Sequence, residues 1–248
     1  SDAPGAVISV STADSNICTV SGLSVTPVGV GTCEVIASAP AVGEYAAAQN
    51  KTQTFPVGAS TQTLTFGAPP AGLRVGATPA TVSVESNAQD AVIAVTSVDE
   101  AICTVSGLSV TPVGVGTCTL QASADAVGVY GSAAPVRLSF PVAARVHTLI
   151  FAAAPTGIRV ADTFAVSASS NAPAATIVYT STSPTVCAVD NATVTALTPG
   201  TCNVRATAAA SGEYEAASAV VQSVQVDPRL QVLTFDAGPV GMRVDAVV

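Results

Sequence analysis

The sequence predicts an all-β protein made of tandem antiparallel β-sandwiches of about 84 residues each. The first observation is a repeated block: residues 17–33 and 102–118 are identical over seventeen positions, and 186–202 is a diverged third copy. The second is the alternation of apolar and polar residues in short runs rich in Val and Thr, which is typical of strands with one buried face. The third is composition, because 4% aromatic residues and no Trp indicate small packing units.

A period of 84 to 85 residues divides the chain. The step from Cys18 to Cys103 is 85 residues, and the step from Cys103 to Cys187 is 84. The motif Thr-Leu-Thr-Phe at 63–66 returns as Thr-Leu-Ile-Phe at 148–151 and Val-Leu-Thr-Phe at 232–235. Several landmarks that share one period indicate a repeat protein. We therefore expect a repeat lacking its first strands at 1–60, complete repeats at 61–144 and 145–228, and the opening of a further repeat at 229–248.

Seven strands and no helix are predicted in the repeat at 61–144. Turn residues separate short runs rich in Val, Thr and Ile at 62–66, 81–85, 91–96, 102–105, 108–111, 117–124 and 136–142. In the run 117–124, apolar and polar residues alternate, with Cys118 on one face and Thr119 on the other. One dry and one wet face per strand favours an antiparallel sandwich over a parallel α/β sheet.

The spacing of these landmarks resembles that of bacterial immunoglobulin-like repeats of the Big type. In the second repeat the pattern consists of Cys103, Val-Thr at 110–111, Gly-Thr-Cys at 116–118 and Gly-Val-Tyr at 128–130. The third copy carries Asp190–Asn191 where the others read Ser-Gly-Leu, and we interpret this as a shorter loop. The resemblance covers nearly the whole chain and implies immunoglobulin-like sandwiches in an extracellular adhesin or fibre protein.

Each repeat holds one pair of cysteines separated by fourteen residues. A zinc site needs about four ligands close together, and a catalytic thiol pair more often reads Cys-x-x-Cys. We favour structural disulfides over either site, since each cysteine falls on a predicted inward face. The expected pairs are Cys18–Cys33, Cys103–Cys118 and Cys187–Cys202. Disulfides of this kind indicate an oxidising compartment, so the predicted location is extracellular, on a bacterial surface or secreted.

Charge and composition exclude several functional classes. The formal net charge of -8 disfavours nucleic acid and anionic membranes as partners. No apolar run reaches the ~20 residues that span a bilayer, so direct membrane insertion is not expected. We find no phosphate loop, nucleophile elbow or paired-carboxylate motif, and no enzyme activity or cofactor is predicted.

Four other sets of residues were considered as sites. His147, the only His, is interpreted as a residue of a linker. The arginines of the Gly-Φ-Arg-Val motif are expected to pack on the sandwich or to pair with an acid of the neighbouring repeat, the alternative being a ligand clamp: Arg74, Arg159 and Arg243. Tyrosines before the last strand are expected to be structural, with a packed ring and a hydroxyl that bonds backbone, the alternative being a glycan platform: Tyr45, Tyr130 and Tyr214. Acids near the junctions offer calcium ligands but lack Asp-x-Asp-x-Asp spacing: Asp99, Glu100, Asp125, Asp162, Asp236 and Asp245.

The repeat frame is open at both ends of the sequence. Ser1 corresponds to Ser86 of the second repeat, while Leu233 and Phe235 belong to a strand that has no repeat of its own. One interpretation is a window within a longer array. The other is strand donation, in which 229–248 of one chain completes the first repeat of the next. The predicted function is a non-catalytic rod or fibre with further copies of the repeat as partners, and the alternative is a module that binds a glycan or receptor.

Overall fold

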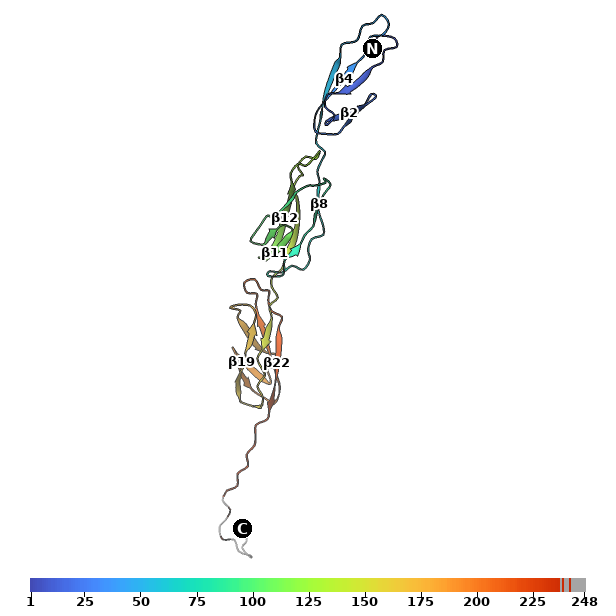
Figure 1. Ribbon diagram of the computed structural model, residues 1–248. Coiled ribbons are helices and arrows are strands. Elements are labelled where there is room, and N and C mark those ends of the chain that lie inside the picture. Colours follow the sequence, from blue (N-terminus) through green and yellow to red (C-terminus); the bar gives the residue numbers. More distant parts are fainter. Residues whose placement is uncertain (237, 239–240, 242–248) are drawn as a thin grey trace. The chain divides into compact units, whose positions relative to one another are not determined.

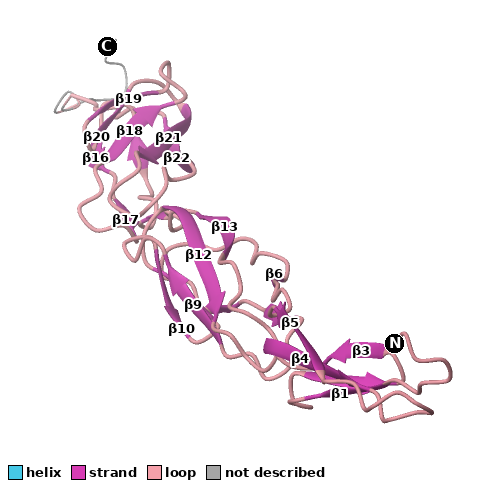
Figure 2. Cartoon of the chain, turned by 90° about the horizontal axis from the view of Figure 1, so that it is seen from above, coloured by secondary structure: helices cyan, strands magenta, loops and turns pink. Residues whose placement is uncertain are grey.

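The computed structural model describes residues 1–236, 238 and 241. Within this part every regular element is a strand, as Figure 2 shows, and the predicted all-β class is confirmed. The chain divides into two compact units, Ser1–Ala143 and Ala144–Val248. The first unit holds the first and second repeats with strands β1–β13, and the second unit holds the third repeat with β14–β22.

The third repeat is a two-layered sandwich (Figure 1). One sheet has the order β15(Ile158–Arg159), β22(Val220–Asp227), β21(Gly200–Ala208), β18(Ile177–Ser181). The other has the order β16(Thr163–Ala165), β20(Thr193–Ala196), β19(Cys187–Asp190), and a short pair joins β14(Leu149–Phe151) to β17(Ala168–Ser170). Val194 of the second sheet and Val204 and Val224 of the first are buried in one core, because alternate residues of each strand point inward.

The second repeat has the same arrangement. Its sheets have the orders β13(Val136–Val142), β12(Gly116–Ala124), β9(Ile93–Ser97) and β10(Cys103–Ser106), β11(Ser109–Pro112), β7(Ala80–Thr81), and β6(Leu64–Phe66) pairs with β8(Val84–Ser86). The predicted alternation holds along β12, where Cys118, Leu120 and Ala122 are fully buried. A second cluster forms around Leu64, which packs on Ala122, Ala124 and Ala133.

Two details of the strands differ from the prediction. The run at 81–85 is two short strands, β7 and β8, separated by the buried Val82, so the chain passes from one sheet to the other there. The Gly-Φ-Arg-Val motif also adds a parallel partner to the last strand, since Arg74 pairs with Ala143 and Ile158 with Val226. A two-residue parallel contact between segments far apart in the chain leaves no alternation in the sequence, which is why it was missed.

The first repeat has five strands among residues 1–58. They are β1(Ser9–Thr12), β4(Gly31–Ser38) and β5(Lys51–Val57) in one sheet, and the hairpin of β2(Cys18–Ser21) and β3(Ser24–Pro27). Within this range no strand corresponds to β6, β7 or β8, which are the strands of the two opening runs predicted at 62–66 and 81–85. The core is correspondingly open, since its buried apolar residues are Cys18, Cys33 and Ala39.

The hairpin of the third repeat is not shortened, contrary to the interpretation of the sequence. Strands β19 and β20 pair Asp190 with Thr193, just as β10 and β11 pair Ser106 with Ser109. Asn191 has a φ of 52° where Gly107 has a φ of 60°. Asn tolerates this left-handed conformation better than most residues, so Asp-Asn-Ala replaces Ser-Gly-Leu without a change of length.

Candidate functional site

The disulfides join the two sheets of each repeat. Cys103 lies on β10 and Cys118 on β12, with 5.6 Å between their Cα atoms. The three bonded pairs, Cys18–Cys33, Cys103–Cys118 and Cys187–Cys202, are fully buried. A hydroxyl on the preceding strand lies close to each, as Ser97 Oγ does at 3.3 Å from Cys103 Sγ. Each bridge therefore holds the two layers together at the centre of a core.

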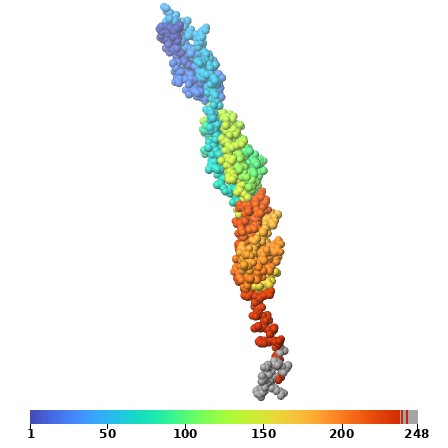
Figure 3. Space-filling model, turned by 180° about the vertical axis from the view of Figure 1, so that it is seen from behind, coloured from blue at the N-terminus to red at the C-terminus, as the bar shows by residue number. Residues whose placement is uncertain are grey.

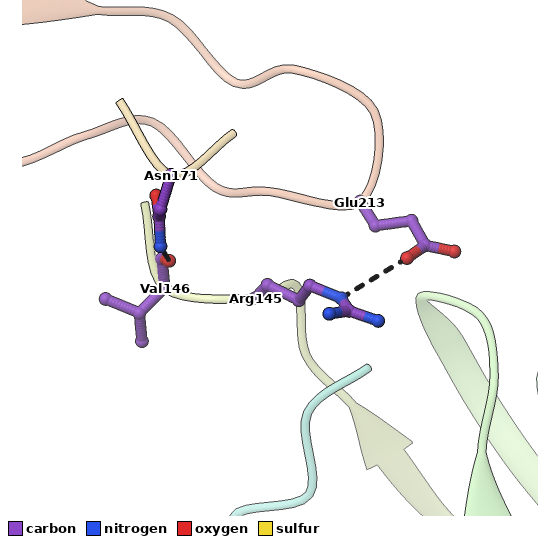
Figure 4. A network of polar contacts seen from close by, with 4 residues as sticks. All are labelled: Arg145, Val146, Asn171 and Glu213. Carbon is purple, nitrogen blue, oxygen red and sulfur yellow. Dashed lines mark hydrogen bonds and ion pairs between the residues drawn. The ribbon is translucent and has the colours of Figure 1, made fainter. Parts of the chain in front are cut away.

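The segment that leads into the third repeat is attached to the turn before its last strand. The N–H of Arg145 donates to Glu213 O at 2.8 Å, and the N–H of Glu215 donates to Arg145 O at 3.0 Å. Arg145 Nε also lies 3.4 Å from Glu213 Oε2 (Figure 4), and its guanidinium lies 5.8 Å from the centre of the Tyr214 ring. Backbone and charge thus fix the start of the repeat to residues 213–215.

Asn171 makes a second attachment to the same segment. Its Nδ2 donates to Val146 O at 3.0 Å, as Figure 4 shows, and its Oδ1 accepts from the N–H of Thr148 at 2.9 Å. One amide side chain therefore supplies two hydrogen bonds to the backbone of residues 146–148, whose polar groups have no neighbouring strand to pair with. We call this set the lead-in clamp: residues 145–148, Ser170, Asn171 and the turn 213–215.

His147 is the buried centre of the lead-in clamp rather than a residue of an exposed linker, so that interpretation was wrong. Its side chain is 3% exposed. Nδ1 lies 3.1 Å from Glu215 O and Nε2 lies 2.7 Å from Ser170 Oγ. Because a carbonyl oxygen only accepts, Nδ1 carries a proton toward Glu215 O, while Nε2 pairs with Ser170 Oγ, which also bonds Ala172 O at 3.2 Å. The ring also meets Tyr214 edge-on at 6.1 Å.

The second repeat builds the same clamp from different residues. Gln62 takes the place of His147, and its amide donates to Asp125 O and Gly131 O and accepts from Ser86 Oγ. Asn87 binds Thr61 O and the N–H of Thr63, as Asn171 does in the third repeat. Ser60 and Val129 replace Arg145 and Glu213, so this turn is held by backbone bonds without an ion pair. No sequence motif marks the clamp, but the shared position of Gln62 and His147 in the repeat was a usable signal.

The chain leaves the third repeat at the opposite end of β22 from the lead-in clamp. Arg159 Nη1 donates to Pro228 O at 2.8 Å, and Arg229 Nε donates to Val160 O at 3.1 Å. The Gly-Φ-Arg-Val arginine therefore binds a carbonyl of the outgoing chain in its own repeat, instead of an acid of a neighbouring one. Arg243 of the same motif lies outside the described residues. The eight residues of β22 separate the two ends by roughly 26 Å.

The other candidate sites have structural surroundings. The tyrosine hydroxyl that binds backbone belongs to Tyr179, which accepts from the N–H of Ala168, and not to one of the three repeated tyrosines. The repeated tyrosines instead close the turn before the last strand through their backbones, as Tyr214 does with Ser211.

Among the residues that the structure describes, no three His, Cys, Asp or Glu side chains lie close enough together to hold a metal ion. The same residues include no helix with the length and apolar character of a membrane span. Asp245 falls outside that range.

The proposed strand donor is exposed. Residues 229–236 follow the last strand without regular structure, and Figure 3 shows them in dark red as a single thread. Leu233 is 82% exposed and Phe235 is 98% exposed. The counterparts of Leu233, Leu64 and Leu149, are buried in the second and third repeats, and those of Phe235, Phe66 and Phe151, are half-buried. The segment thus presents the apolar side chains of a first strand to solvent.

Comparison with known proteins gives distant structural similarity only. No family model and no curated protein matches the chain. Among solved structures, it is similar to domains 1–6 of the surface layer protein SbsC, with 15% identity over 94% of this chain and 36% of that chain and a TM-score of 0.30. It is also similar to Drosophila N-cadherin EC1-4, with 14% identity over 92% of this chain and 69% of that chain and a TM-score of 0.29. The chain spans about a third of the length of the first two surface-layer structures that it matches.

Proposed function

We propose that the chain is a non-catalytic structural array, whose immunoglobulin-like repeats act in series as a rod or fibre on a bacterial surface. Three buried disulfides support an extracellular location, because such bonds persist in oxidising compartments. Repetition of one sandwich with one bridge supports a spacing or filament role of the kind found for Big-type repeats in adhesin stalks.

The observation that carries the proposal is the position of the two chain ends in a repeat. The lead-in segment is attached beside the start of the last strand, at Tyr214 in the third repeat and at Tyr130 in the second. The outgoing chain leaves at the far end of that strand, where Val226 pairs with Ile158. Tension applied to the chain therefore acts along the length of the sandwich. The disulfide joins the two sheets that carry this tension.

Single-molecule force spectroscopy tests this role. A disulfide keeps the loop between its cysteines from extending, and Cys103 and Cys118 are 15 residues apart. In the double variant Cys103→Ala with Cys118→Ala, the unfolding of the second repeat should release roughly 50 Å more chain than in the wild type. The third repeat of the same molecule is the control, since its increment should not change. If the second repeat released the same length of chain in the wild type and in the double variant, the disulfide would not limit extension under force, and the proposed mechanical role would be contradicted.

A further inference from the structure

The larger sheet of the third repeat ends in a strand with one open edge. In the order β15, β22, β21, β18, strand β18 is the last, and among the strands that the structure describes it pairs with β21 alone. The other end of this sheet is β15, which has two residues and is too short to offer a comparable edge. The five residues of β18 therefore form an open edge inside a complete repeat.

The register shows which backbone groups point to this open edge. Thr182 donates its N–H to Asn203 O at 2.9 Å, so this pair of residues is hydrogen-bonded. Because hydrogen-bonded and non-hydrogen-bonded pairs alternate in an antiparallel ladder, Val178 also bonds β21 through its backbone. The N–H and C=O groups of Ile177 and Tyr179 then point away from β21. These four groups lie on alternate residues, as the addition of a further strand requires.

The surroundings of the β18 edge leave room for another strand. A hollow of about 350 Å³ lies beside it, lined by residues 176–179 and by Asn191 and Ala192 at the tip of the β19–β20 hairpin. Residues 176–181 read Thr-Ile-Val-Tyr-Thr-Ser and include no proline and no charged residue. Natural edges are often protected by Lys or Pro, because unpaired backbone groups otherwise pair with another chain. The β18 edge lacks this protection.

The edge is complementary to itself when two copies meet antiparallel with their Val178 residues opposite each other. In that register Ile177 of one copy faces Tyr179 of the other, and the two residues exchange N–H···O bonds on both sides of the two-fold axis. All four free backbone groups of each copy then have a partner. Val178 is 53% exposed, so the two valines bury apolar surface at the axis.

The corresponding edge of the second repeat offers a weaker contact. Strand β9 also lies at the end of its sheet, but Ala94 stands at the position of Val178. Two alanines at the axis would bury less apolar surface than two valines. The larger side chain therefore favours the edge of the third repeat.

We propose that two copies of this chain associate side by side through the β18 edges of their third repeats. The inference rests on the proposed structural role and names its partner, a second copy related by a two-fold axis. The four-stranded sheets of the two copies then form one continuous sheet. Because the contact involves one short strand from each copy, the association is reversible and depends on concentration.

Cysteine trapping tests this register on the full oxidised chain. Val178→Cys adds one thiol to a chain whose six cysteines are all paired, and directly opposed residues of a non-hydrogen-bonded pair lie within reach of a disulfide. Pairing holds the two thiols at a high effective concentration, so a covalent dimer should form at least about tenfold faster than for Val221→Cys. Val221 is the matched control, because it is 56% exposed on β22, away from the edge of the same sheet.

Charges placed at the axis test the same contact by sedimentation. The mass of the wild type should rise with concentration from 24.2 kDa toward twice that value. Val178→Lys and Val178→Glu each put like charges opposite each other, so each variant alone should associate at least about fivefold more weakly. A 1:1 mixture of the two should restore association, because opposite charges then face each other. This rescue would not occur if either variant were misfolded, and Val221→Lys should associate as the wild type does.

A Val178→Cys chain that cross-links no faster than the Val221→Cys chain would overturn the inference. So would a wild-type chain that stays at 24.2 kDa at every concentration, or a Val178→Lys chain that associates as the wild type does. None of these results depends on the extension of single repeats under force. Failure here with the expected force increments would contradict the edge contact alone, whereas unchanged increments in the variant without Cys103 and Cys118 would count against the structural role itself.

Discussion

At the scale of single residues, one buried polar position links the start of a repeat to its end. It is Gln62 in the second repeat and His147 in the third, and both satisfy a carbonyl of the turn before the last strand and a serine hydroxyl. Two different side chains serve because each presents a donor and an acceptor at about the same separation. This position therefore requires a side chain that can donate one hydrogen bond and accept another, and it does not require an imidazole ring.

Replacing His147 tests this interpretation. His147→Gln should keep the free energy of unfolding within about 1 kcal/mol of wild type, since Gln62 makes the same contacts in the second repeat. His147→Leu should lose about 1–3 kcal/mol, because the hydrogen bonds that His147 makes to Glu215 O and Ser170 Oγ are lost at a buried site. Urea unfolding of the oxidised chain measures both values. If leucine were tolerated as well as glutamine, the hydrogen bonds would not be what this position requires.

At the scale of elements, the Gly-Thr-Cys motif opens the longest strand of each repeat. Gly116 has a φ of 151°, which side chains other than glycine rarely adopt, and an added Cβ would lie 2.9 Å from Ile102 Cδ1. Gly31 and Gly200 have the same conformation in the other two repeats. The glycine lets the chain turn into β12 directly beneath Ile102, two residues before the bridging Cys118.

Gly116→Ala should therefore destabilise the second repeat by about 1–3 kcal/mol through backbone strain and the contact with Ile102. Gly58→Ala is the matched control, because the Cβ added there meets nothing within 4 Å and its φ lies outside the left-handed range. Thermal unfolding followed by circular dichroism would compare the two. Equal melting temperatures for both variants would show that the strand start tolerates a side chain.

At the scale of the whole molecule, the same seventeen residues fold in two surroundings. In residues 102–118, Val110 is fully buried and Leu108 is 41% exposed. In residues 17–33, the counterpart Val25 is half-buried and Leu23 is 79% exposed. The second repeat covers this block with β6, β7 and β8, and the first repeat has no such cover among its described residues. Local sequence is thus identical while burial is not.

Hydrogen exchange should report this difference directly. Amides of β4 should exchange faster than those of β12, because less apolar surface protects them. Equal protection of the two strands would show that the burial around β12 is not what slows exchange there.

The sequence by itself determined the class of fold, the period and the buried faces of the long strands. Alternation along 117–124 and 136–142 reports which side chains are buried, and the Cys-to-Cys period reports how often the unit recurs, because both are local or periodic properties of the chain. The tertiary structure decided the parallel contact of Ile158 with Val226, the switch of sheets at Val82 and the burial of His147. These properties depend on which distant segments meet. The sequence of one strand specifies which of its faces is apolar, but it does not specify which other segment packs against that face.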